Sequence, residues 1–329
     1  MSLGRAWAHE LPNKLDQAKK YGFEGIELFY EDLEYVARSI DEKVLPETLI
    51  QAAHIVRRLC DERNLEIIAL QPFMHYEGLR DRTWHAERVA EMKVWLRLAK
   101  ILGTNLIQIP STFLCEEKVT GDKAVIVADM KEIAELGMKE DPTMRFAYES
   151  LAWGTYVNRW QDSWDIVQRV DMPNFGIILD TFNIAARVYA DPASPSGTNP
   201  NAQADMKTSL EEMKHTIDPT KIFFVQLADA ERLERPLIEG HELHDATQPP
   251  RMSWSRNCRL FYGEEAQGGY LPIKDIADVI VNDLGYAGWI SFELFHKSIT
   301  MAVEDVPAKM ASRGEDSWKR FVTDLKLNA

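Results

Sequence analysis

Three carboxylates and one carboxamide occur along this sequence, each within or at the end of an apolar run. Glu149 closes the run that starts at residue 145, Asp180 closes the run from residue 175, and Gln226 and Glu293 lie in the runs that start near residues 222 and 289. A buried ionised carboxylate is costly unless it is paired or bound to a cation. One such acid alone is more often a capped or edge residue. Four together indicate the convergent oxygen donors that a hard divalent cation requires.

The elements that must position these side chains are strands that alternate with helices. Apolar runs of strand length begin near residues 23, 65, 105, 145, 175, 221 and 289. The starts at 24, 65, 105 and 145 are spaced by 41, 40 and 40 residues, which is typical of repeated βα units. We therefore expect an α/β fold, a (β/α)₈ TIM barrel that forms one domain over residues 1–329. Long loops are expected at 182–219 and 230–271, where such a barrel builds its site or a lid.

The first strand of this barrel is missing from the count, because seven strands are found and eight are needed. The only place for it is before the helix that begins near Pro12, where just Met1–Gly4 are available. We expect the first strand to be absent or reduced to a stub, as a late start codon or a trimmed N-terminus would leave it. The alternative is a short strand over Leu3–Ala8.

Composition excludes several classes of protein. The chain has 38 basic and 52 acidic residues, a formal charge of −14, so an extended nucleic-acid-binding face is not expected. Cys60, Cys115 and Cys258 are odd in number and form no CxxC pair, which favours a reduced, cytoplasmic protein. No apolar stretch is long enough to span a membrane. An anionic small-molecule substrate is not excluded but would need a local basic pocket, and the sequence leaves a homo-oligomer open.

Several motifs resemble those of a known family. The segments Tyr148–Gly154, Leu179–Phe182, Val225–Asp229 and Phe292–Phe295 resemble the xylose-isomerase-like sugar phosphate isomerase/epimerase barrels. Arg251–Phe261, Gly268–Pro272 and Ile26–Leu33 are similar to the branch of fungal and bacterial 3-dehydroshikimate dehydratases. The resemblance covers nearly the whole chain. It implies a lyase of quinate and shikimate catabolism that dehydrates 3-dehydroshikimate to protocatechuate through a metal-stabilised enolate.

The resemblance also implies the metal ligands, which would be Glu149, Asp180, Gln226 and Glu293. Most of the wider superfamily has a metal-binding His where this chain has Gln226, whereas the dehydratase branch can carry Gln. The resulting oxygen-only site suits Mg²⁺, Mn²⁺ or Co²⁺. Some relatives place a general base where this chain has Leu151 and Asn183, so the resemblance does not assign the base here.

The catalytic candidates are therefore taken from strand ends. His75 comes first, because it follows the strand that ends near Gln71 and an imidazole of near-neutral pKa accepts a proton at working pH. Its alternative reading is a surface loop residue. His296 and Glu27 are the reserves, and Glu27 could equally hold a ligand or a substrate hydroxyl.

An arginine should hold the substrate carboxylate, since its planar fork matches a carboxylate. Arg256 is the first choice, with Arg251 and Arg259 beside it in the long connection, although some of these could simply pair with nearby acids. Further candidates for substrate contact are Gln71, Asn183 and Trp254.

Two other functions compete with the dehydratase. One is a divalent-metal-dependent sugar or ketose isomerase or epimerase, or an inosose-type dehydratase, because the same cation can steer an enediolate to several products. Gln226 and the Trp254-Ser255-Arg256 match argue against it. The other is a barrel that only binds a ligand, against which the four retained ligand positions argue. A metal-dependent abasic-site endonuclease is not favoured, because the eight His are scattered.

Overall fold

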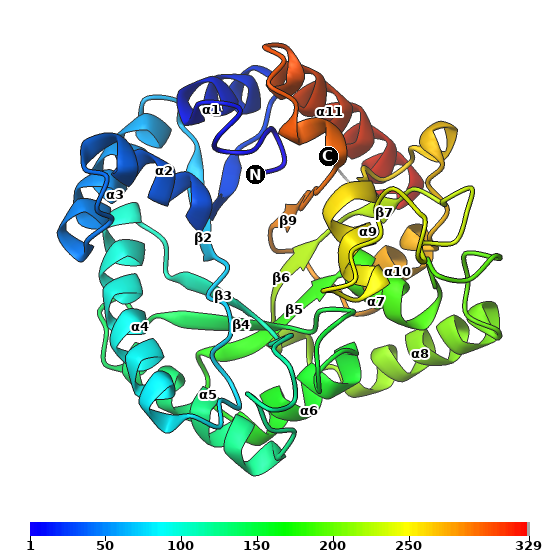
Figure 1. The fold of residues 1–329 in the computed structure, drawn as a ribbon, viewed down its shortest axis with the longest axis horizontal. Helices are drawn as coiled ribbons and strands as arrows, with labels where there is room; N and C mark the ends of the chain where they lie inside the picture. Colours follow the sequence, from blue (N-terminus) through cyan, green and yellow to red (C-terminus); the bar gives the residue numbers. More distant parts are fainter. Residues whose placement is uncertain (328–329) are drawn as a thin grey trace. The chain divides into compact units, whose positions relative to one another are not determined.

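Strands and helices alternate along the chain in its computed structural model, which describes residues 1–327 (Figure 1). Seven strands form one sheet in the order β1-β2-β3-β4-β5-β6-β9. They are β1 Gly25–Phe29, β2 Glu66–Gln71, β3 Leu106–Pro110, β4 Arg145–Glu149, β5 Phe175–Asp180, β6 Ile222–Gln226 and β9 Ile290–Ser291. Each begins within two residues of the predicted start. The predicted series of strands is confirmed.

The chain divides into two compact units, and the boundary falls inside β5. The first unit is Met1 with Arg5–Ile177, and the second is Ser2–Gly4 with the residues from Ile178 onward. Neighbouring strands from β1 to β5 pair in parallel, as do β6 and β9. A single domain remains a prediction.

The first unit is built of βα repeats. Its helices are α1 Leu11–Lys20, α2 Tyr30–Ile40, α3 Pro46–Asp61, α4 Arg82–Leu102, α5 Lys123–Met138 and α6 Trp160–Val170. The longest is α4. At its start the Asp81 carboxylate accepts hydrogen bonds from the backbone N–H groups of Thr83 and Trp84, and it ends at Gly103, whose φ is +77°. Helices α3 and α4 pack on β2, and α5 and α6 pack on β4. Strands β3 and β5 are buried along their whole length, which explains why their sequences are apolar without alternation.

The second unit holds both long connections. Its helices are α7 Thr181–Val188, α8 Ala202–Thr216, α9 Pro250–Cys258, α10 Ile273–Asp278 and α11 Val306–Asp324. Short helical turns are η1 Pro219–Lys221, η2 Glu265–Gln267, η3 Val279–Asp283 and η4 Lys297–Thr300. A small antiparallel pair joins β7 Asp229–Ala230 to β8 Arg259–Leu260. Helix α9 leads directly into β8. The sequence did not predict this helix. None of the described helices is long and apolar enough to cross a membrane.

The N-terminal residues contain no strand before α1. Arg5 to His9 form a turn in which the backbone N–H groups of Ala8 and His9 both bond to the Arg5 carbonyl. The predicted absence of a full first strand is confirmed, and the alternative strand over Leu3–Ala8 is wrong. Ser2 Oγ donates to the Phe292 carbonyl at 2.7 Å and accepts the Leu294 N–H at 2.9 Å. Ser2–Gly4 is therefore the predicted stub, bonded to the chain just after β9.

Candidate active site

The four predicted ligand residues all lie at or just after the ends of strands. Glu149 is the last residue of β4 in the first unit. In the second unit Asp180 ends β5, Gln226 ends β6, and Glu293 follows β9 by two residues. All four side chains are buried. Carboxyl ends of parallel strands are where α/β proteins place their sites, so each residue occupies a position suited to chemistry.

Asp180 is held from both sides. Its Oδ1 accepts the Phe182 N–H at 2.8 Å and caps α7, while Oδ2 accepts the Asn183 side-chain amide at 2.7 Å. Asn183, at the position where some relatives are expected to carry a base, thus orients a predicted ligand. Its amide donates to that carboxylate and supplies no base of its own.

Arg259 joins Asp180 to Glu293. Its Nη1 lies 3.0 Å from Asp180 Oδ2, 3.0 Å from Glu293 Oε2 and 3.1 Å from the Glu293 carbonyl. Its Nε donates to Ser255 Oγ at 3.1 Å, and its Cζ lies 4.3 Å from the Phe182 ring centroid. Only 1% of the Arg259 side chain is exposed. The guanidinium is therefore fixed by the two carboxylates, a role that sequence reasoning missed.

The other two candidate arginines lie in different surroundings. Arg251 donates to the carbonyls of Ala186 and Ala190 at 2.7 and 2.9 Å, so it ties α9 to the end of α7. Arg256 is exposed and donates to Gln248 Oε1 at 2.8 Å.

Trp254 is completely buried and lies inside an aromatic cluster. Its indole N–H donates to the Glu231 carbonyl at 2.9 Å, and its ring lies 5.1 Å from Phe182 and 6.2 Å from Tyr270. Phe182 of this cluster also packs against the guanidinium of Arg259. These contacts within the protein account for Trp254, and no contact with a substrate is needed to explain it.

The first unit holds the remaining catalytic candidates. Gln71 Nε2 donates to Glu27 Oε2 at 3.1 Å, which pairs these two side chains across β1 and β2. His75 lies in the loop after β2 with φ +53°, and its Nδ1 is 3.2 Å from Thr112 Oγ1. Burial lowers the pKa of His75 to about 4, so the imidazole is neutral at working pH and the near-neutral pKa expected from its residue type does not apply.

His296 has a clear structural task. Its Nδ1 accepts the Ser298 N–H at 3.1 Å and lies 2.7 Å from Ser298 Oγ, so the ring caps η4. Burial lowers its pKa to about 4. Because a nitrogen that accepts an N–H carries no proton, the neutral ring is protonated on Nε2.

The sequence did not single out one buried acidic residue of these loops, Glu77. Glu77 follows His75 by two residues and is buried beside Thr112 and Tyr148. The only available signal was its place in the loop that leaves β2.

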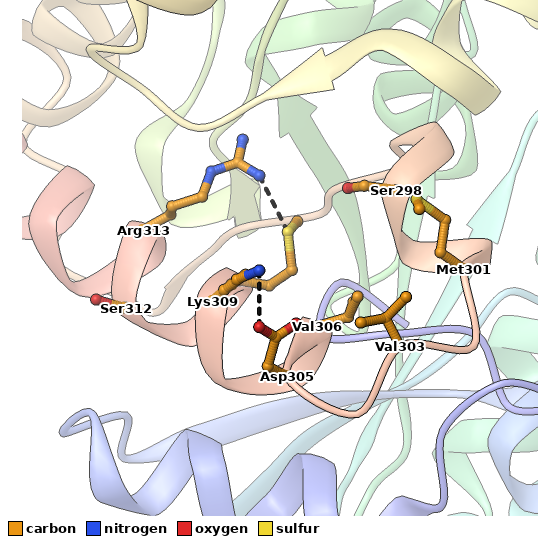
Figure 2. A pocket seen from close by; sticks show the side chains of 9 residues that line it. Ser298, Met301, Val303, Asp305, Val306, Lys309, Ser312 and Arg313 are labelled. Atoms are coloured by element: carbon orange, nitrogen blue, oxygen red, sulfur yellow. Dashed lines mark hydrogen bonds and ion pairs between the residues drawn. The ribbon is translucent and has the colours of Figure 1, made fainter.

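A separate cavity of about 460 Å³ lies in the second unit (Figure 2). Its lining comes from η4, the loop after it and α11, and includes Met301, Val303, Lys309 and Arg313. Lys309 pairs with Asp305 at 2.7 Å. None of the predicted site residues lines this cavity.

Comparison with known proteins places the chain in a family. A family model described as a xylose isomerase-like TIM barrel matches residues 15–319. A curated 3-dehydroshikimate dehydratase of Neurospora crassa is 48% identical, and the match covers 99% of this chain and 93% of that protein. A 3-dehydroshikimate dehydratase of Pseudomonas aeruginosa is 33% identical over 89% of this chain, which spans only 37% of that longer protein.

A solved structure shares the fold. The IOLI protein, solved with a bound zinc atom, is 18% identical, has a TM-score of 0.67, and is matched over 98% of this chain and 94% of that chain. The series of strands, the family model and the curated relatives all point to the same family. This chain belongs to the xylose isomerase-like TIM barrel family.

Proposed function

We propose that this chain is a hydro-lyase that converts 3-dehydroshikimate to protocatechuate with the help of a divalent cation. The observation that carries the proposal is the buried set of oxygen donors at strand ends, with Gln226 in place of a histidine. The activity of the Neurospora crassa relative, matched over nearly its whole length, supports the same reaction.

The proposed ligands are Glu149, Asp180, Gln226 and Glu293. The three carboxylates are a group that could hold a metal ion, and the carboxamide adds a fourth oxygen donor. Oxygen donors of this kind suit Mg²⁺, Mn²⁺ or Co²⁺ better than zinc, which favours His and Cys ligands. In the second unit Asp180 and Glu293 already share a cationic partner, Arg259, as expected of carboxylates that are paired rather than isolated.

The reaction removes a proton next to the ketone and then expels hydroxide, so one water is lost and the ring becomes aromatic. A bound divalent cation supplies Lewis-acid stabilisation of the enolate charge. We assign the proton abstraction to His75, whose neutral imidazole is free of a competing proton above pH 4. His296 is a weaker candidate because its Nδ1 caps η4.

The substrate is a carboxylate, and Arg256 is the arginine we assign to it. It is the exposed arginine of α9, whereas Arg251 is bonded to backbone carbonyls and Arg259 to the two proposed ligands. Glu27, in the middle of β1, and Gln71, at the end of β2, are bonded to each other and are assigned to the substrate hydroxyls. A cytoplasmic location and a homo-oligomer remain predictions.

The test is ultraviolet absorbance of purified protein with 3-dehydroshikimate. Growth of a protocatechuate signal that EDTA abolishes and Mg²⁺, Mn²⁺ or Co²⁺ restores would support both reaction and cation. Asp180→Asn should lose the signal, while Asp165→Asn, which alters an exposed ion pair with Lys123, should keep it. No signal under any metal, together with turnover of a ketose, would replace this proposal with an isomerase or epimerase.

A further inference from the structure

Glu77 is a buried carboxyl group for which the reaction scheme above has no role. It lies in the first unit, in the loop between β2 and α4, and only 1% of it is exposed. Its Oε1 accepts the Thr112 N–H at 2.6 Å and the Tyr148 hydroxyl at 3.1 Å. Its Oε2 is buried and has no hydrogen-bond partner within the described part of the chain. A buried acid with one bare oxygen is costly, so its retention requires an explanation.

The same hydrogen bonds lead to His75. Thr112 offers its N–H to Glu77 and places its Oγ1 3.2 Å from His75 Nδ1. The hydroxyl is itself positioned, because it also accepts the Leu114 N–H at 3.3 Å. Glu77 and His75 are thus connected twice, once along the chain and once through Thr112.

The loop that carries His75 needs such support. His75 has φ +53°, a left-handed conformation that a residue with a side chain adopts only when its surroundings hold it there. Its ring and that of Phe113 make an edge-to-face contact at a centroid distance of 4.4 Å. Tyr148 belongs to β4, a buried strand, so its bond to Glu77 anchors the loop to a rigid element.

We propose that Glu77 is a positioning residue, which sets the orientation of the His75 ring through Thr112 and anchors that arrangement to β4 through Tyr148. The proposal deepens the proposed function and rests on it for the role of His75 as the base. The contacts of Glu77 with Thr112 and Tyr148 are made in the protein alone, so the positioning can be measured without turnover.

The experiment compares Glu77→Met with Glu77→Gln. Met has a similar length but accepts no strong hydrogen bond, whereas Gln keeps a carbonyl oxygen for the Thr112 N–H. The matched control is Asn174→Leu, since Asn174 is equally buried in the same unit and donates to the carbonyls of Ala134 and Met144 at the opposite end of the strands. Its loss should lower stability without reaching His75.

Two readouts separate positioning from mere stability. In protein labelled with ¹⁵N-histidine, the His75 ring signals are identified by their disappearance in His75→Gln. Glu77→Met should shift these signals and lower kcat by about 10-fold or more, within the range of general acid–base effects, with KM nearly unchanged. Glu77→Gln should restore both. Asn174→Leu should leave the His75 signals and the kcat per folded molecule as in the parent protein.

The proposal is overturned if Glu77→Met keeps the parent His75 signals and kcat, or if it differs from the parent only as Asn174→Leu does. If Glu77→Met does not fold, Thr112→Val decides, because it removes the hydroxyl that contacts His75. Unchanged His75 signals in that variant would equally refute the link. A parent protein that does not dehydrate 3-dehydroshikimate, but whose His75 signals shift in Glu77→Met, would refute the proposed function and leave the positioning intact.

Discussion

Replacement of Arg259 by Met should destabilise the protein strongly when no divalent cation is present. The guanidinium contacts Asp180 and Glu293 at 3.0 Å each and is almost fully buried. Opposite charges whose centres are about 4 Å apart attract by about 4 kcal/mol at an effective dielectric constant of 20. Two such attractions are lost in the variant. Part of this loss is offset, because the folded state no longer buries a desolvated guanidinium. We therefore expect a net loss of about 3–5 kcal/mol, the usual result of breaking a buried ion pair.

A divalent cation should return part of that stability. A cation at 100 times its dissociation constant stabilises the folded state by about 2.7 kcal/mol, provided that it does not bind the unfolded chain. The variant has lost its own positive charge beside the carboxylates, so the gain on adding Mn²⁺ should be larger in Arg259→Met than in the parent protein.

The assay is urea unfolding followed by tryptophan fluorescence, in EDTA and in Mn²⁺. Arg313→Met is the control, since Arg313 forms a partly buried ion pair with Glu264 at 2.7 Å in the same unit. Its loss of stability should be smaller and indifferent to Mn²⁺. A loss below about 1 kcal/mol for Arg259→Met, the value of an exposed pair, or an equal loss with and without Mn²⁺, would refute the reasoning.

Three further predictions follow from the site. Burial raises the pKa of Glu77 from 4.5 to about 7, so the folded state keeps this proton longer than the unfolded state. The stabilisation of the folded state by protonated Glu77 is thus complete below pH 4.5 and is lost as pH rises through 7. The loss amounts to about 3 kcal/mol, at 1.36 kcal/mol per pKa unit. Urea unfolding at pH 5 and pH 8 should show a change in stability about 3 kcal/mol more unfavourable in the parent than in Glu77→Gln, since His75, His296 and the other groups that titrate in this range are common to both. His75→Gln should lower kcat at least 100-fold. In the parent, kcat/KM should fall on acidification near pH 4, where His75 titrates, rather than near pH 6.5. A fall of kcat/KM near pH 6.5 would exclude His75 as the base. Gln226→His should move metal preference from Mg²⁺ towards Zn²⁺, measured by calorimetric titration, and unchanged preference would remove Gln226 from the ligand set.

The strands were predictable because each is an apolar run bounded by turn residues, and the ligand candidates because each closes such a run or lies within it. Helix α9 was not predictable in the same way. Its residues, Pro250–Cys258, are mostly polar, and its buried face is determined by packing against distant aromatic side chains.

The roles of the arginines could not be read from sequence either. Arg251, Arg256 and Arg259 share one residue type within nine positions, yet one contacts backbone carbonyls, one is exposed and one contacts two carboxylates. Partners of this kind are chosen by tertiary contacts. The low pKa of His75 is likewise a consequence of burial, which its residue type does not reveal.

The position of Arg259 also bears on how well the proposed cation would work. The three proposed carboxylate ligands would outweigh the two charges of a divalent cation and would leave an excess of −1. Arg259, bonded to Asp180 and Glu293, would offset that excess. With Arg259 beside these carboxylates, a bound cation would stabilise developing enolate charge more strongly, because the surrounding carboxylates would repel that charge less.

Arg259→Met should therefore separate two properties that usually change together. Its cation should bind more tightly, since a nearby positive charge is gone, while kcat falls, since the enolate meets an extra negative charge. A simple structural defect would weaken both. Calorimetric titration with Mn²⁺ and kcat for 3-dehydroshikimate at saturating Mn²⁺ measure the two effects on one sample. Weaker binding together with lower kcat would mean that Arg259 only preserves the geometry of the carboxylates, and that charge balance does not explain its burial between them.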